Sequence, residues 1–210
     1  MTNVMCENNV TLVGKVTNKL LSHQQLGMSY YEITVRVNRL TEGKYDEIPV
    51  LTPQWVVKNI EEGMTVKVCG ELRVYKNRGN SWQTKRLMVF TKKVQVLSGE
   101  TEHVNQVLIV GNLHNVWEAR KTPLTERVIT DFSVMIDRIA GYGKQNKADV
   151  IHCIAWSEQA NFVSKLPTGT KLNISGRVQA RTFDKRHSDG SITKEWVHEV
   201  SCRSVRVERN

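Results

Sequence analysis

Residues Lys171 to Phe183 read Lys-Leu-Asn-Ile-Ser-Gly-Arg-Val-Gln-Ala-Arg-Thr-Phe. Successive side chains of a β-strand point to opposite faces, so this alternation predicts a strand with one apolar and one polar face. The apolar face, which we expect to be buried, carries Leu172, Ile174, Val178 and Ala180. The opposite face, which we expect to meet water, carries Arg177, Gln179, Arg181 and Phe183. Arginines beside an aromatic ring suit a flat, anionic ligand, and nucleic acid has both properties.

The same pattern occurs a second time, in the segment Met64 to Tyr75. There the residues expected to point inward are Val66, Val68, Leu72 and Val74, and those expected to point outward are Arg73 and Tyr75. Glycines also recur at matching places, Gly14 with Gly111 and Gly70 with Gly176. An internal repeat of this length predicts two units, at residues 1–103 and 104–210.

Each half contains three strand-like segments, a short helix-like segment and two further strand-like segments. The helices are predicted at Pro53 to Glu62, with Trp55 in the core, and at Ser157 to Lys165. Five strands with one helix between the third and the fourth are typical of the OB-fold, a Greek-key barrel. We therefore predict an all-β protein with two tandem OB-folds. A pair of unrelated small β-sandwiches is the alternative, but the matching glycines count against it.

Positive charge is spread over the whole chain. It has 30 Lys and Arg against 21 Asp and Glu, a formal net charge of +9. The excess is 4 in residues 1–103 and 5 in residues 104–210, so no tail holds it. A distributed positive charge attracts polyanions to both halves, which favours a nucleic-acid partner over a small neutral substrate.

Sequence signals of catalysis, metal binding and export are missing. The cysteines Cys6, Cys69, Cys153 and Cys202 form no Cys-x-x-Cys pair, and the six histidines have no metal-ligand spacing. We therefore predict no enzyme activity, no metal and no cofactor. The N-terminus has no signal-peptide pattern, and the apolar runs are too short to cross a bilayer, so we expect a cytoplasmic protein.

Three segments of the second half resemble the bacterial single-stranded-DNA-binding protein family. They are Val110-Gly111-Asn112-Leu113, Val150 to Trp156 (Val-Ile-His-Cys-Ile-Ala-Trp) and Asn161 to Phe183. The resemblance covers nearly all of residues 104–208. The first half is similar to a more diverged copy, at Asn9 to Val16, Tyr31 to Arg39 and Gly63 to Arg73. The whole chain resembles the version of the family with two OB-folds in tandem.

This resemblance implies a surface on which aromatic rings stack on unpaired bases while arginines and lysines follow the phosphates. Trp156 and Phe183 match stacking positions of the family, and Trp196 matches an aromatic on the next hairpin strand. Val150 departs from the pattern, because the family often has tryptophan there. In the first half, Tyr45 matches the position of Val150, and Asn77 stands where Phe183 would. We therefore expect the second half to contribute more to binding.

The remaining candidates come from the residues themselves. His152 shares a strand face with Trp156, and Trp82 and Trp117 lie beside basic loops. A strand and its hairpin would align a basic row. The candidate DNA-binding residues are Trp156, Phe183, Arg177, Arg181, Lys185, Arg186, His152, Lys194, Trp196, Tyr45, Arg73, Tyr75, Arg78, Trp82 and Trp117. For each ring the alternative is core packing, which the strand pattern opposes for Trp156 and Phe183 and leaves open for Trp196.

Two functions remain as hypotheses. The first is a non-catalytic protein that binds and protects single-stranded DNA, whatever its sequence, in replication, recombination and repair. The resemblance implies four OB-folds per assembly and hence a homodimer, with replication or repair proteins as further partners. Recruitment through the family's acidic C-terminal tail is not predicted, because the chain stops at Asn210. The second hypothesis is a replication-accessory, primosome-like OB protein that binds chiefly protein or RNA.

Overall fold

A computed structural model describes residues 7–76, 85–122, 125–138, 147–186 and 189–208 of the chain. The first half of these residues forms β1 (Asn8–Gln25), β2 (Met28–Asn38), β3 (Tyr45–Pro53), α1 (Gln54–Val57), β4 (Thr65–Lys76) and β5 (Lys85–Leu97). The second half forms β6 (Val104–Val116), β7 (Arg120–Lys121), β8 (Val128–Asp137), β9 (Ala148–Trp156), α2 (Glu158–Val163), β10 (Lys171–Arg186) and β11 (Ile192–Val207). Both short helices follow the third long strand of their half.

Each half closes into a five-stranded barrel. In the first barrel the strands are hydrogen-bonded in the order β1-β2-β3-β5-β4, and β4 pairs with β1. In the second barrel the order is β6-β8-β9-β11-β10, and β10 pairs with β6. The third and fifth long strands of each barrel run parallel, and the other pairs are antiparallel. This is the order of an OB-fold, so the prediction of two tandem OB-folds is confirmed.

Alternation along the two repeated strands fills the barrel interiors. Leu172, Ile174 and Val178 on β10 are at most 1% exposed, and so are Val66, Val68 and Leu72 on β4. These predictions are confirmed. The prediction for Gln179 was wrong, because its side chain is 8% exposed and contacts Glu199 rather than water.

Glycine at two matching positions lets neighbouring strands approach closely. A Cβ on Gly70 would lie 2.2 Å from the carbonyl oxygen of Phe90, and one on Gly176 would lie 2.4 Å from that of Ser201. Both glycines stand where the pairing with the next strand shifts register. Such bulges bend a strand sharply, which a closed barrel requires.

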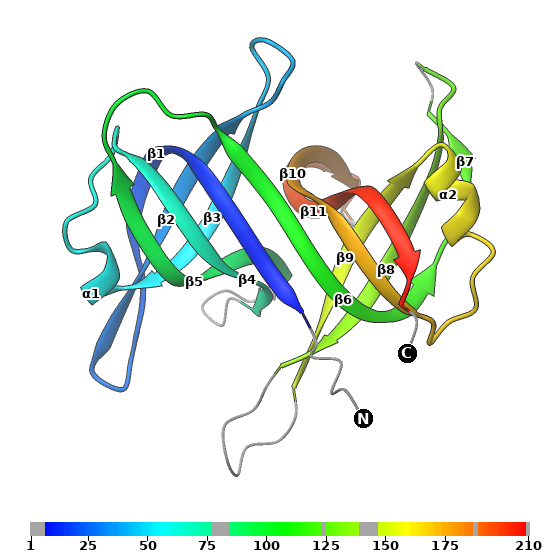
Figure 1. The fold of residues 1–210 in the computed structure, drawn as a ribbon, viewed down its shortest axis with the longest axis horizontal. Coiled ribbons are helices and arrows are strands. Elements are labelled where there is room, and N and C mark those ends of the chain that lie inside the picture. The colour runs from blue at the N-terminus through cyan, green and yellow to red at the C-terminus, as the bar shows by residue number, and fades with distance from the viewer. Residues whose placement is uncertain (1–6, 77–84, 123–124, 139–146, 187–188, 209–210) are drawn as a thin grey trace.

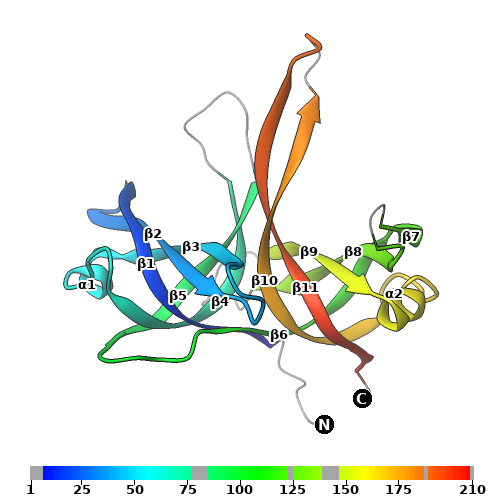
Figure 2. The ribbon, with the colours of Figure 1, turned by 90° about the horizontal axis from the view of Figure 1, so that it is seen from above.

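The two barrels share a sheet through their first strands. β1 and β6 run antiparallel side by side, as Figure 1 shows, and Val10 pairs with its own counterpart Val107. The boundary between residues 103 and 104 remains a prediction; we use first barrel for β1–β5 and second barrel for β6–β11. Seen from above, the hairpin of β10 and β11 rises out of the layer that the barrels form (Figure 2).

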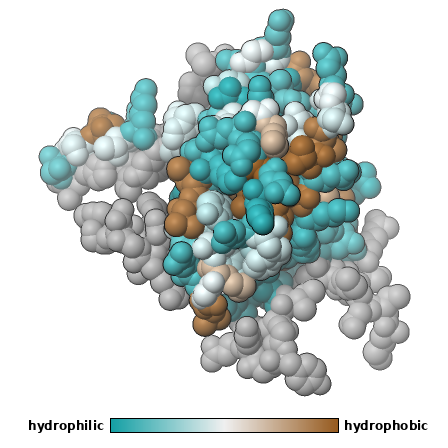
Figure 3. All heavy atoms as spheres, turned by 90° about the vertical axis from the view of Figure 1, so that its left-hand side faces the viewer, coloured by the Kyte–Doolittle hydropathy of each residue, from teal (hydrophilic) through white to brown (hydrophobic). Residues whose placement is uncertain are grey.

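The first helix differs from the sequence prediction. It spans only Gln54–Val57, and the residues it and the following turn bury are Val57 and Ile60. Trp55 was predicted to be core, but 64% of it is exposed. Residues two positions apart in a helix are separated by about 200° around its axis, so burying Val57 turns Trp55 outward. Figure 3 shows the face of the first barrel, where hydrophobic residues form separate patches between hydrophilic ones.

Candidate nucleic-acid interface

A groove of about 2490 Å³ runs across both barrels. Residues of β1–β5 form its first wall. Residues of β6–β11, with the segment between β6 and β7, form its second wall. Both walls carry aromatic and basic side chains. The groove is therefore one surface to which each barrel contributes.

Three rings of the first wall are stacked. His23 on β1 lies parallel to Tyr30 on β2, with ring centroids 4.9 Å apart and an interplanar angle of 5°. Tyr75 on β4 stacks on His23 at 5.7 Å and 28°, and its hydroxyl lies 3.3 Å from His23 Nδ1. We call Tyr30, His23 and Tyr75 the ring column. Phe90, also in the groove, lies under the guanidinium of Arg73 at 5.6 Å.

The second wall carries two exposed tryptophans. Trp196 on β11 is 66% exposed, and Trp117 is 44% exposed. The Trp117 ring lies 6.1 Å from that of His152 on β9. Exposed indoles on a surface that also carries arginines are the usual platform for unpaired bases.

The arginines of the groove are paired with carboxylates. Arg86 pairs with Glu32 on the first wall, and Arg120 pairs with Asp131 on the second. Arg181 donates from Nε to both carboxylate oxygens of Glu199 at 3.0 Å, while 46% of its side chain stays exposed. A guanidinium has five N–H donors, so one such pair leaves donors for a phosphate.

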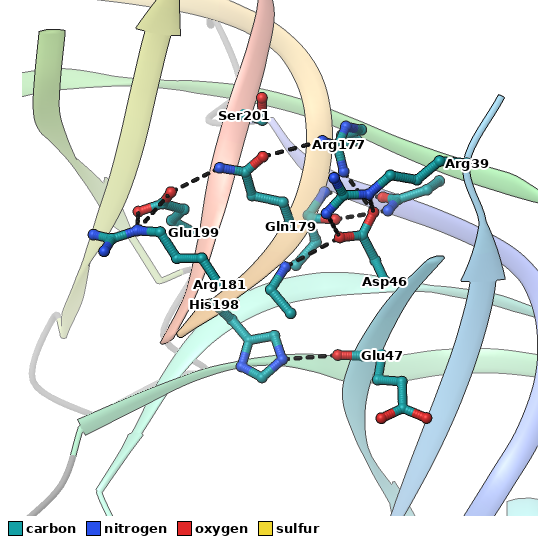
Figure 4. Close-up of polar contacts among 12 residues, drawn as sticks. Arg39, Asp46, Glu47, Arg177, Gln179, Arg181, His198, Glu199 and Ser201 are labelled. Atoms are coloured by element: carbon teal, nitrogen blue, oxygen red, sulfur yellow. Dashed lines mark hydrogen bonds and ion pairs between the residues drawn. The ribbon is translucent and has the colours of Figure 1, made fainter. Parts of the chain in front are cut away.

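A buried carboxylate of the first barrel, Asp46, links the two barrels beside the groove. Asp46 on β3 is 1% exposed and accepts hydrogen bonds from its neighbour Arg39 and from Arg177 of the second barrel, each at 2.5 Å. It also accepts from the backbone N–H of Ala180 at 3.2 Å (Figure 4). Burial is the main cause that lowers the pKa of Arg177, and the charge of Asp46 opposes it. We call Asp46, Arg39, Arg177 and Ala180 the inter-barrel latch.

The same contact is made in the other direction. Asp149 on β9 is 3% exposed, pairs with Arg138 at 2.5 Å and accepts a bond from the backbone N–H of Val74 in the first barrel at 2.9 Å. His198 on β11 adds a third bridge, because its Nε2 donates to the carbonyl oxygen of Glu47 at 2.8 Å (Figure 4). These contacts fix the orientation of the two groove walls.

Some of the sequence candidates meet in this groove. Those that line it are Tyr75, Trp117, His152, Arg181 and Trp196. Arg186 and Lys194 are exposed on the projecting hairpin, away from the groove lining. The predicted row of basic side chains is thus divided between groove and hairpin.

Four other candidates have partners outside the groove. The half-buried Trp156 donates from Nε1 to the Ser201 hydroxyl at 3.1 Å. Arg177 was expected to face water, but it is held by Asp46 in the latch. Arg73 pairs with Glu71, and Tyr45 lies under the Arg36 guanidinium at 4.4 Å.

The predicted match of Tyr45 with Val150 was wrong. Strand pairing places Asp46 opposite Val37 and Asp149 opposite Ile136. Asp46 forms an ion pair with Arg39, which follows β2, and Asp149 forms one with Arg138, which follows β8. The two aspartates are therefore counterparts, so Tyr45 corresponds to Ala148.

Four candidates lie wholly or partly outside the residues that the structure describes. The backbones of Phe183 and Lys185 lie on β10 opposite Glu195 and Thr193. Their side-chain positions are not described. Arg78 and Trp82 lie outside the described residues.

Several groove residues were missed from the sequence. They are His23, Tyr30, Arg86, Phe90, Arg120 and Arg138. The sequence pattern reads as a strand only from Val10 to Val16, whereas β1 continues to Gln25. Rings on both sides of the turn at Gly27 are the signal that could have found His23 and Tyr30, since residues flanking a hairpin turn pair across it.

The described residues contain neither a helix that could span a membrane nor a cluster of metal ligands. No helix in these ranges is long and apolar enough to span a membrane. Within the same ranges, no group of three or more His, Cys, Asp or Glu side chains could hold a metal ion.

Two OB barrels with a common groove of ring faces and arginines define an OB-fold protein of the nucleic-acid-binding class. Residues 104–207 match the model of the single-strand binding protein family. The chain belongs to this family, which confirms the resemblance seen in the sequence.

Individual relatives agree with this membership. The single-stranded DNA-binding protein of Clostridium tetani is 34% identical over 107 residues, 49% of this chain and 69% of that protein. Single-stranded DNA-binding protein 2 of Clostridium acetobutylicum is 31% identical over 107 residues, 49% of this chain and 75% of that protein. The crystal structure of the Thermus aquaticus single-stranded DNA binding protein has a TM-score of 0.72 at 17% identity, over 99% of this chain and 95% of that one. The likeness in fold thus extends over both barrels.

Proposed function

We propose that the protein binds single-stranded DNA in the groove between its barrels, without sequence preference and without catalysis. The observation that carries the proposal is the groove itself, in which rings and arginines from both barrels line one continuous surface. Membership of the single-strand binding protein family supports the choice of DNA as ligand.

Binding combines two physical terms. Bases stack on exposed rings such as Trp196 and Trp117, at roughly 1–3 kcal/mol per base, and every base has a ring face, so sequence matters little. Lysines and arginines replace the cations condensed on the phosphates, which makes the affinity fall as salt is added. The net charge of +9 has the sign that this term needs.

The cellular role follows from this chemistry. A strand held in the groove is protected from re-pairing and from nucleases during replication, recombination and repair. The names of the relatives support this role, since they are called single-stranded DNA-binding proteins. We propose a homodimer, because two chains supply four barrels, and replication or repair proteins as partners. The cytoplasm is the proposed site of action.

A titration with oligothymidine tests the proposal. We expect tryptophan fluorescence to be quenched, because Trp117 and Trp196 lie in the groove, and we expect affinity to fall steeply with salt. Duplex DNA of equal length is the control and should bind far more weakly. Absence of quenching at low salt would reject DNA binding, and a strong preference for matched RNA would support the accessory function instead.

A further inference from the structure

We infer that the ring column of Tyr30, His23 and Tyr75 is a second base-stacking site, placed on the first barrel. Its ligand is an unpaired stretch of the same strand that the second barrel holds. The inference rests on the proposed function and adds to it a site that the sequence did not indicate as a unit.

The column is assembled from three strands. His23 and Tyr30 are directly paired across the β1–β2 hairpin, and Tyr75 comes from β4, which lies on the other side of β1. A cross-strand ring pair alone would be explained as stabilisation of the hairpin. The third ring extends the stack to β4, where Tyr75 is paired in register with Arg86 of β5.

The rings have the exposure that a ligand needs. All three are half-buried and line the groove. Each tyrosine has one face on His23, and within the described ranges neither has a second aromatic or cation–π partner. An offset-stacked base can therefore extend the column at a tyrosine end.

Charge next to the column suits a nucleotide. Arg86 is exposed, and its ion pair with Glu32 is at the surface, with 43% of the arginine side chain accessible. A pair of this kind is weak, so a phosphate can compete with the carboxylate for the guanidinium. A base on the column and a phosphate at Arg86 can thus be bound together.

The second barrel is reached along the same groove. The residues of that wall include Arg138, Lys147, Asp149, Trp117 and Trp196. A strand long enough to cover two barrels can contact both walls, whereas a short strand needs only one. A single OB-fold covers about 4–16 nucleotides, so strands of about 10 and about 30 nucleotides separate these cases.

The test is a double variant, Tyr30→Ala with Tyr75→Ala, in the full chain. We expect its affinity for the strand of about 30 nucleotides to fall by roughly 10-fold or more, from the loss of stacking. The shorter strand should be affected little, because the second barrel still binds it. The Tyr30→Phe, Tyr75→Phe pair keeps both ring faces and should restore binding to the long strand.

Controls separate this inference from the proposed function. Trp55→Ala removes a ring of the same barrel that is 64% exposed but lies outside the groove, and it should leave both affinities unchanged. If the unaltered protein binds neither strand, the proposed function fails. If it binds both and the double alanine variant binds the long strand equally well, only the second site is rejected.

A measurement on the unaltered protein covers the case in which the double variant does not fold. Oligothymidine substituted with iododeoxyuridine is cross-linked by light, and the modified peptides are mapped by mass spectrometry. We expect cross-links to Tyr30, His23 or Tyr75 with the long strand. Cross-links confined to the second barrel overturn the inference.

Discussion

The carboxylate of Asp46 accepts a hydrogen bond from the backbone N–H of Ala180, 3.2 Å away in the other barrel. The counterpart residues make the same bond in reverse, from Val74 to Asp149 at 2.9 Å. Each barrel therefore inserts a buried aspartate against the fourth long strand of the other. Together with the bridges from Arg177 and His198, these bonds hold the groove walls in place relative to each other.

Replacing Asp46 with asparagine should destabilise the protein. The substitution leaves Arg39 and Arg177 without a counter-charge at a site where both are about two-thirds buried. Breaking a fully buried pair costs about 3–5 kcal/mol, and partial exposure reduces this, so we expect a loss of about 2–4 kcal/mol. Urea unfolding measures it.

The matched control for that variant is the next residue. Glu47→Gln removes a carboxylate that pairs with Arg36 at the surface, where both side chains are more than a third exposed. Such a pair contributes about 0–1 kcal/mol. Equal losses for the two variants would contradict the structural role assigned to Asp46.

Trp196→Ala and Trp55→Ala compare two tryptophans of almost equal exposure, 66% and 64%. Trp196 lines the groove, whereas Trp55 lies on α1 outside it. We expect Trp196→Ala to weaken oligothymidine binding by about 5-fold to 150-fold, which corresponds to roughly 1–3 kcal/mol of stacking. Trp55→Ala should bind as the unaltered protein does. The reverse result would place the DNA elsewhere.

Acid should destabilise the contact between the two barrels through His198. Burial lowers the pKa of this histidine in the folded protein, although its bond to the Glu47 carbonyl acts in the opposite direction. Below its ordinary pKa of about 6.5, the unfolded chain binds the proton more readily than the folded one, so stability falls as the pH drops through this range. Above about pH 7.5 the contribution is fully present.

Unfolding free energies at about pH 7.5 and about pH 5.5 measure this effect. His198→Gln keeps a donor for Glu47 but cannot titrate, so it should lose less stability on acidification than the unaltered protein. His114→Gln replaces an exposed histidine and should leave the fall unchanged. If His198→Gln lost as much stability on acidification as the unaltered protein, other groups would be the cause.

Gly176→Ala should destabilise the second barrel. Its Cβ would meet the carbonyl oxygen of Ser201 at 2.4 Å, and a backbone atom cannot move aside as a side chain can. Overpacking of this kind costs about 1–3 kcal/mol, measured by thermal or urea unfolding. The neighbouring Ser175 points to the opposite face of β10, so Ser175→Ala should change the free energy of unfolding by about 0.5 kcal/mol or less. If Gly176→Ala left the stability unchanged, β10 and β11 would be able to move apart.

The barrels were predictable because their strands obey a local rule. Leu172 and Ile174 alternate with polar residues, and so do Val66 and Val68, so periodicity alone assigns their faces. Trp55 was misplaced because helix spacing identifies which residues share a face but does not say which face of a four-residue helix turns inward.

The groove was only partly predictable. Arg181 follows from strand alternation, and Trp196 follows from the family resemblance. Arg177 has the same local pattern as Arg181 but pairs instead with Asp46, 131 residues away in the chain. An arginine that faces another barrel has no sequence feature that distinguishes it from one that faces water. The ring column was missed for a similar reason, since Tyr75 meets His23 only after β4 has paired with β1.

The antiparallel pairing of β1 with β6 has a consequence for how the halves diverge. Because one polypeptide carries both, every molecule contains one of each, and dilution cannot separate them. Substitutions that make one wall tyrosine-rich and the other tryptophan-rich are therefore inherited together as a matched set. A dimer of identical single-barrel subunits could not keep its two binding walls different in this way.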